Sequence, residues 1–117
     1  MAVSIDGEKV EALVEGLDAM LDHMNDSYRE WMKTDDPIKK RMCSEYHASL
    51  TYYMGKKYVK VVTNESVCAF VVACENDNKF EFGDILKPAG WKAPARNFRR
   101  GNVLDRSFDR VRWTGAL

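Results

Sequence analysis

Basic and aromatic side chains are concentrated in residues 83–113, GDILKPAGWKAPARNFRRGNVLDRSFDRVRW. The bases are Lys87, Lys92, Arg96, Arg99, Arg100, Arg106, Arg110 and Arg112, against three aspartates. Arginine forks match phosphate oxygens, and aromatic rings such as Trp91, Phe98 and Trp113 can stack on bases. This composition predicts a site for nucleic acid or another polyanion. The alternative is that the tryptophans anchor the segment to the core and the arginines form a solvated surface that satisfies loop carbonyls.

Within this segment, RNFRRGN (residues 96–102) is expected to be the part left free to bind. Gly101 permits a left-handed turn in which successive backbone N–H groups form an anion-binding nest, and a plain turn is the simpler alternative. Trp91 and Trp113 are interpreted as anchors rather than base-stacking residues. The sequence contains no GxxxxGK[ST] or GxGxxG motif, so the usual nucleotide-binding folds receive no support.

The cysteines and histidines do not form a recognisable catalytic or metal site. Cys43 and His47 are four residues apart, which on a helix brings both side chains toward one ion, but two ligands do not make a site. No orienting acid or oxyanion hole accompanies them as a catalytic dyad. With three cysteines and no CxxC pair, we expect reduced, buried thiols. We therefore expect no catalytic residue, no metal and no cofactor.

The formal net charge of zero hides a division along the chain. Residues 1–38 contain ten acids and three bases. The remaining residues then contain eight acids and 15 bases, because each total is 18. The two parts therefore carry about −7 and +7, which predicts either one basic face or two faces that neutralise each other in a homo-oligomer.

A long helix is predicted over residues 7–33, because apolar residues recur at steps of three and four from Val10 to Trp31. Asp6 is the expected N-cap, with Ile5 packing on Val10. An acidic row on this helix can mimic a phosphate backbone and bind a basic partner; it is formed by Glu11, Glu15, Asp18 and Asp22. An ordinary solvent-facing side is the alternative, and the near-heptad spacing is also compatible with helix pairing between subunits.

A second helix is predicted from Pro37, with Asp36 as its N-cap. Its expected apolar side is formed by Ile38, Met42, Tyr46 and Leu50. The aromatic and threonine content of SLTYYM favours a strand from about Leu50 onward.

Three later runs predict the sheet. KKYVKVV (56–62) and SVCAFVVAC (66–74) should pair as an antiparallel hairpin, and the second run is apolar on both faces, which indicates a covered central strand. KFEF (79–82) alternates and predicts a further strand, and a last strand is expected near FDRVRW (108–113). The predicted fold class is α+β: two N-terminal helices packed on a small antiparallel β-meander, followed by an irregular basic segment, in a single domain over residues 1–117.

Residues 49–115 resemble a family of small, largely uncharacterised proteins encoded by tailed bacteriophages. The resemblance is carried by a tyrosine-rich strand pair, a GDILKxAxWxAPARNxxRGN signature and a closing WTG. Here the signature runs from Gly83 to Asn102, with KPAGW in place of KAASW. The resemblance implies a helical part over residues 1–48, interpreted as an addition in this protein, and a phage-family part over residues 49–117.

The resemblance also implies a phage protein that acts in the cytoplasm of the host cell, and it supplies no active site. The sequence shows no signal peptide and no membrane-spanning apolar run, so no membrane partner is expected. We expect a non-enzymatic accessory protein that binds nucleic acid or another polyanion through the basic segment. The alternative is a module that inhibits or redirects a host protein through the acidic helix. An enzyme or a nucleotide-sequestering protein would need a deep pocket lined by convergent polar groups.

Overall fold

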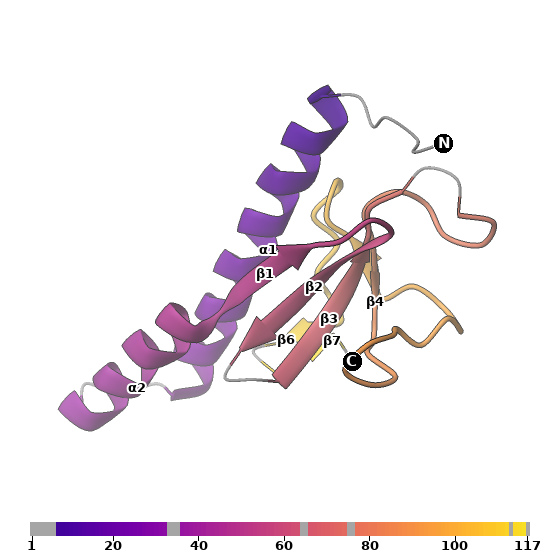
Figure 1. Cartoon of the computed structure of the whole chain (residues 1–117). Helices are drawn as coiled ribbons and strands as arrows, with labels where there is room; N and C mark the ends of the chain where they lie inside the picture. Colours follow the sequence, from indigo (N-terminus) through magenta and orange to yellow (C-terminus); the bar gives the residue numbers. More distant parts are fainter. Residues whose placement is uncertain (1–6, 33–35, 64–65, 75–76, 113, 117) are drawn as a thin grey trace.

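In the computed structural model of the chain, two helices precede all the strands (Figure 1). The structure describes residues 7–32, 36–63, 66–74, 77–112 and 114–116. Helix α1 covers Gly7–Met32 and helix α2 covers Pro37–Ser49. The strands are β1 (Thr51–Met54), β2 (Tyr58–Thr63), β3 (Ser66–Val72), β4 (Asp84–Leu86), β5 (Gly101–Asn102), β6 (Val111–Arg112) and β7 (Gly115–Ala116).

The first five strands form an antiparallel meander in the order β1-β2-β3-β4-β5, and β6 pairs with β7 in a second, two-stranded sheet. This arrangement confirms the α+β fold class. The predicted hairpin is also confirmed, with Val59 opposite Val71 and Val61 opposite Ala69 in the β2–β3 pair. Strand β3 is central in the sheet, as its two apolar faces predicted.

Helix α1 covers the inner face of the sheet. Its apolar positions at three- and four-residue steps, such as Leu13, Leu17 and Met20, are almost fully buried. They belong to one core cluster with the inward residues of the strands, among them Val59 and Val71. Packing within this domain therefore buries the apolar stripe, and pairing between subunits, with which its near-heptad spacing is also compatible, is not needed for that burial.

The outer face of the sheet has its own apolar layer. Phe70 and Leu86, neighbours across β3 and β4, form a second buried cluster with Val72, Cys74 and Phe80. Phe80 comes from the irregular chain that follows β3, so this chain covers part of the outer face. Any charged group in the covering chain therefore lies close to an apolar surface and needs a polar partner.

Helix α2 begins as the sequence predicts. The Asp36 side chain caps it, because its Oδ1 accepts a hydrogen bond of 2.9 Å from the backbone N–H of Ile38, and Pro37 occupies the first turn. The helix ends at Ser49 and β1 starts at Thr51, which confirms the change from helix to strand near Leu50.

Two sequence-based predictions are wrong. KFEF is not a strand: Asp77 Oδ1 accepts hydrogen bonds from the backbone N–H groups of Lys79 and Phe80, which bends the chain, and the next strand is only Asp84–Leu86. The prediction of an apolar, buried side on α2 is half wrong, because Ile38 and Met42 are 70% and 43% exposed. The predictions for Ile5, Asp6 and Trp113 concern residues outside the described ranges.

The cysteines of the structure are free thiols, with Cys68 and Cys74 buried. Burial raises the pKa of the Cys68 thiol to about 11, which keeps this group protonated and unreactive at neutral pH. Among the described residues, neither helix combines the length and the apolar composition needed to cross a membrane.

At Gly16, helix α1 packs closely against the backbone of Val103. A Cβ atom at this position would lie 2.6 Å from the backbone oxygen of Val103. We predict that Gly16→Ala lowers the free energy of unfolding by about 1–3 kcal/mol despite the higher helix propensity of alanine, because the helix must move away. Urea unfolding followed by circular dichroism measures this change.

Gly7→Ala is the matched control, since a Cβ at Gly7 meets no atom within 4 Å and the residue lies at the start of the same helix. If both variants unfold at the same urea concentration, the contact between α1 and Val103 leaves room for a side chain at position 16, which contradicts the prediction.

Candidate nucleic-acid interface

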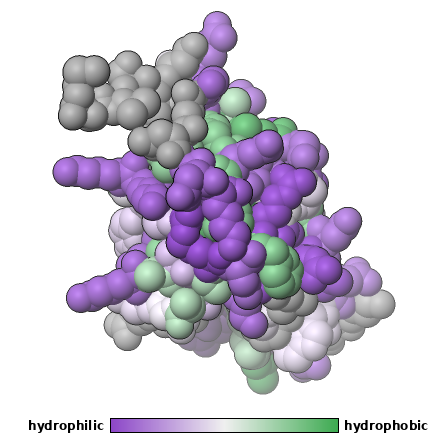
Figure 2. All heavy atoms as spheres, turned by 90° about the vertical axis from the view of Figure 1, so that its right-hand side faces the viewer, coloured by the Kyte–Doolittle hydropathy of each residue, from purple (hydrophilic) through white to green (hydrophobic). Residues whose placement is uncertain are grey.

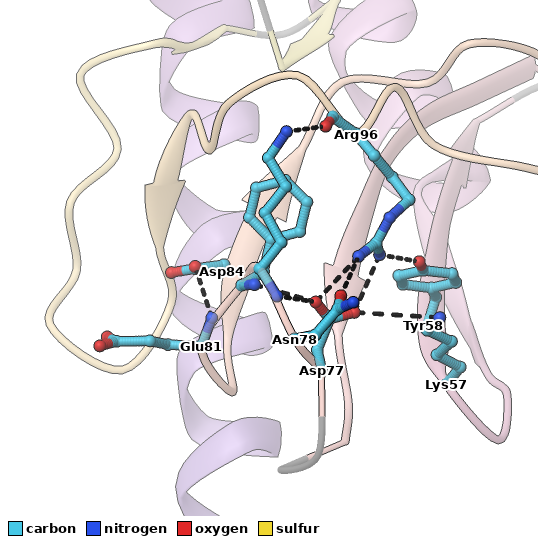
Figure 3. A network of polar contacts seen from close by, with 9 residues as sticks. Lys57, Tyr58, Asp77, Asn78, Glu81, Asp84 and Arg96 are labelled. Atoms are coloured by element: carbon cyan, nitrogen blue, oxygen red, sulfur yellow. Dashed lines mark hydrogen bonds and ion pairs between the residues drawn. The ribbon is translucent and has the colours of Figure 1, made fainter.

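A buried carboxylate holds the most prominent arginine of the irregular segment (Figure 3). Arg96 donates from its two terminal nitrogens to the two oxygens of Asp77, at 2.8 and 2.9 Å, and also donates to the Tyr58 hydroxyl at 2.5 Å. The Asp77 side chain is fully buried and the Arg96 side chain is 32% exposed. The hydrogen bonds from Arg96 hold the pKa of Asp77 well below its usual range and raise the pKa of Arg96 itself. This pair joins the chain after β3 to the chain before β5 and to β2.

A second buried carboxylate connects β4 and β5. Asp84 Oδ1 accepts hydrogen bonds from Arg99 Nη1 at 3.1 Å and from Asn102 Nδ2 at 2.9 Å, while Oδ2 accepts from the backbone N–H of Glu81. Asp84 and Asn102 are register partners in the β4–β5 pair. Asp84 of the GDIL segment therefore binds Arg99 and Asn102 of the RRGN segment inside the fold.

Three more of the predicted bases also bind the chain itself. Arg100 is buried, and its Nη1 donates to the Asn97 side chain and to the Phe98 carbonyl, both at 2.6 Å. Its guanidinium also lies 3.8 Å from the centroid of the Phe98 ring. Arg106 donates to the Val103 carbonyl and Arg112 to the Asp109 carbonyl. These contacts fit the alternative that loop carbonyls are satisfied by arginines.

The segment 96–102 is therefore not the free loop that the sequence led us to expect. Gly101 lies in β5 at φ 148°, and a Cβ atom at this position would clash with the backbone oxygen of Ser107, so it forms neither the nest nor the plain turn. The adjacent N–H groups of Arg100 and Asn102 already donate to Ile85 O and Ser107 Oγ. Seen from the side of these loops, hydrophilic side chains gather over the middle of the molecule (Figure 2).

The remaining predicted bases, Lys87, Lys92 and Arg110, are exposed, and only Lys92 adjoins a hollow rich in other lysines. The hollow is lined by Tyr53, Met54, Gly55, Lys56, Lys57, Tyr58, Lys60, Phe70, Trp91 and Lys92. We call these residues the lysine-aromatic surface. It contains four lysines and four aromatic residues, and no acid belongs to the described lining.

The β-sheet register positions this surface. Tyr53, Lys60 and Phe70 are successive register partners on β1, β2 and β3, so they form a row on the outer face. The Lys60 ammonium lies 4.6 Å from the Trp91 ring centroid and 5.9 Å from that of Phe70. Trp91 is 49% exposed, so it is not the buried anchor that was expected.

Comparison with protein families gives one match. The model of a family of unknown function, DUF7717, matches residues 5–117. The chain belongs to this family. No curated protein and no solved structure matches it.

The DUF7717 match includes α1, so the first helix lies within the matched family. The helix is also an integral part of the core that it shares with the strands. In this DUF7717 protein the acidic row of Glu11, Glu15, Asp18 and Asp22 is exposed along α1.

Cys43 and His47 face a different hollow, between α2 and the end of α1, which Arg29, Lys39 and Lys40 also line. Within the described ranges, no three His, Cys, Asp or Glu side chains are grouped closely enough to hold a metal ion.

Sequence reasoning missed most of the lysine-aromatic surface. Lys56, Lys57 and Lys60 were read only as part of a strand, although the run YMGKKYVK combines a turn glycine, lysines and tyrosines. Alternation along a strand places Tyr58 and Lys60 on one side, and this was the available signal. The contribution of Trp91 and Lys92 depends on how the later chain returns to the sheet.

Replacing Asp77 tests the structural role of the arginine. We predict that Asp77→Asn lowers the free energy of unfolding by about 2 kcal/mol, because Arg96 loses its charged partner while one third of its side chain stays exposed to water. Urea unfolding at neutral pH measures the loss. Arg41→Gln is the control, since the Arg41–Glu45 pair is mostly exposed and should contribute under about 0.5 kcal/mol. Equal losses in the two variants would contradict the assignment.

The same ion pair predicts a pH dependence. The folded-state pKa of Asp77 is lowered by Arg96, so its stabilisation is present above the unfolded-state pKa of about 4 and is lost as the pH falls toward the folded-state value. The difference in unfolding free energy between wild type and Asp77→Asn should be constant from neutral pH to about pH 5 and should shrink below about pH 4. Urea unfolding over this pH range provides the measurement, and a difference that stays constant at low pH would refute the prediction.

Proposed function

We propose that this protein binds single-stranded nucleic acid through the lysine-aromatic surface. The observation that carries the proposal is that Lys56, Lys57, Lys60 and Lys92 line one hollow with the exposed Trp91 ring. The lining contains no acid among the described residues, although Lys57 also lies 3.9 Å from Asp77 Oδ2. This site replaces the basic segment as the proposed contact, because five of the eight predicted bases bind groups of the chain itself.

The chemistry of the surface favours a single strand over a duplex. Lysine ammonium groups are strongly hydrated point charges that neutralise phosphates without fixed geometry. The rings of Trp91 and Tyr53 are 49% and 62% exposed, so each can offer a face to an unpaired base. In a duplex the base faces are stacked on each other and these rings could not reach them.

The proposal predicts salt-sensitive binding of an oligothymidylate of about 20 nucleotides, measured by fluorescence anisotropy. The variant Lys56→Gln, Lys60→Gln, Lys92→Gln should reduce the slope of log affinity against log salt by about 2, since each lost phosphate contact contributes about 0.7 on a single strand. The control variant Lys9→Gln, Lys40→Gln, Lys87→Gln removes the same charge from exposed positions elsewhere and should keep the wild-type slope.

Trp91→Leu separates stacking from charge in the same assay. It should weaken binding by about tenfold while leaving the salt slope unchanged, because a base–aromatic stack contributes about 1–3 kcal/mol. Equal effects of the two lysine variants would show that binding is not located at this surface. No binding by the wild-type protein at low salt would overturn the proposal and leave the acidic row of α1 as the candidate contact, for a basic protein partner.

A further inference from the structure

We propose that the hollow between α2 and the end of α1 binds a small phosphomonoester. The hollow has a volume of about 490 Å³, which lies within the range of pockets that take small organic ligands. Its polar lining among the described residues consists of Arg29, Lys39, Lys40, Ser44 and His47. Every charged side chain in this lining is a base, so the hollow attracts an anion.

The sequence of α2 gathers these groups on one side of the helix. Lys40, Ser44 and His47 follow each other at steps of four and three residues, so their side chains lie above one another. Lys39 belongs to the same side, because it lines the same hollow. Arg29 comes from the last turn of α1. The bases are therefore supplied by two helices, one on each side of the hollow.

The fold itself does not use the polar groups that α2 contributes. Within the described part of the chain, no hydrogen-bond or ion-pair partner exists for the side chains of Lys39, Lys40, Ser44 and His47. Arg29 differs, because it lies 3.6 Å from Asp26 in an exposed ion pair that contributes little to stability. The donors of α2 thus remain available to a ligand, unlike most arginines of the basic segment.

The two lysines occupy an unfavourable part of the helix. Lys39 and Lys40 follow Pro37 in the first turn of α2, and this turn contains no acid after the Asp36 cap. The helix dipole is positive at this end, so it repels cations and attracts anions. A bound anion removes this repulsion. The same two side chains therefore destabilise the empty helix slightly and stabilise the complex.

The combination of groups fits a phosphomonoester. At neutral pH its phosphate group carries close to two negative charges and offers three acceptor oxygens. Lysines neutralise such a group as point charges, and the Ser44 hydroxyl and the His47 ring can donate hydrogen bonds to it. Met32 and Cys43 also line the hollow and pack against the core, which gives it an apolar floor. The organic part of the ligand lies on this floor.

This hollow is separate from the lysine-aromatic surface. Helix α2 lies at the end of the molecule away from the β1–β2 turn (Figure 1), and the two linings have no residue in common. The inference therefore does not rest on the proposed function. It concerns a small molecule, and either proposal can fail without the other.

Titration of the ¹⁵N-labelled full chain with phenyl phosphate, followed through the backbone amide signals by NMR, tests the site. Saturable shifts are expected in residues 39–47 and around Arg29. Inorganic phosphate should bind about tenfold more weakly, because it buries no apolar group on the floor of the hollow. Phenyl sulfate, which has the same ring and a single negative charge, should also bind more weakly than phenyl phosphate.

Lys40→Gln separates ligand binding from a structural role. It should weaken the binding of phenyl phosphate about tenfold, because a charge-assisted contact is lost. Its melting temperature without ligand should be no lower than that of the wild type, since it removes a cation from the positive end of α2. Arg41→Gln is the matched control: it removes the same charge from the next residue, whose side chain pairs with Glu45 and does not line the hollow. It should bind phenyl phosphate like the wild type.

Three results overturn the proposal. The first is the absence of saturable shifts up to about 10 mM phenyl phosphate, which is weaker than a specific small-molecule site requires. The second is a set of shifts centred on Trp91 and its neighbouring lysines instead of α2. The third is equal binding by Lys40→Gln and Arg41→Gln, or equal affinity for inorganic phosphate and phenyl phosphate.

Discussion

The ion pair between Asp77 and Arg96 is the interaction on which the outer layer of this protein depends. The chain between β3 and β5 has little regular structure, so its backbone groups cannot rely on a ladder of hydrogen bonds. Asp77 replaces part of that ladder, because it accepts from two backbone N–H groups as well as from Arg96. A fully buried carboxylate is tolerated only when its charge is compensated, and Arg96 supplies the compensation from 19 residues away. Without it, Phe80 would lose its support against Phe70 and Leu86.

This use of arginine decides which bases remain for a ligand. A guanidinium presents several donors in a fixed plane and suits two-point contacts with carboxylates and carbonyls, whereas an ammonium keeps its hydration and stays in solvent. The structure largely follows this division: Arg96, Arg99 and Arg100 donate hydrogen bonds within the fold, whereas on the β1–β2 hairpin Lys56 and Lys57 are exposed and Lys60 is half-buried. Counting positive charge along the sequence therefore does not show which bases are engaged within the fold.

The sequence predicted the parts of the fold that are governed by local patterns. The periodicity of α1, the Asp36–Pro37 start of α2 and the valine-rich hairpin all depend on neighbouring residues, and all three are confirmed. KFEF alternates like a strand, but the hydrogen bonds of Asp77 bend the chain there, and no local rule indicates that Asp77 will bind Arg96. The candidate site was missed for the same reason, because Trp91 reaches Lys60 only through the path of the covering chain.

The distribution of charge also explains why aromatic rings matter to the proposed site. The acidic row is exposed on α1, which covers the inner face, while the lysine-aromatic surface lies on the outer face of the hairpin. With a net charge of zero, the protein exerts little attraction on a distant polyanion, and the field of the lysines is screened within about 8–10 Å at physiological salt. Binding at the proposed site would then depend on short-range contacts. Stacking on Trp91 and Tyr53 would provide a contact that salt does not screen, on the face opposite to the one that α1 covers.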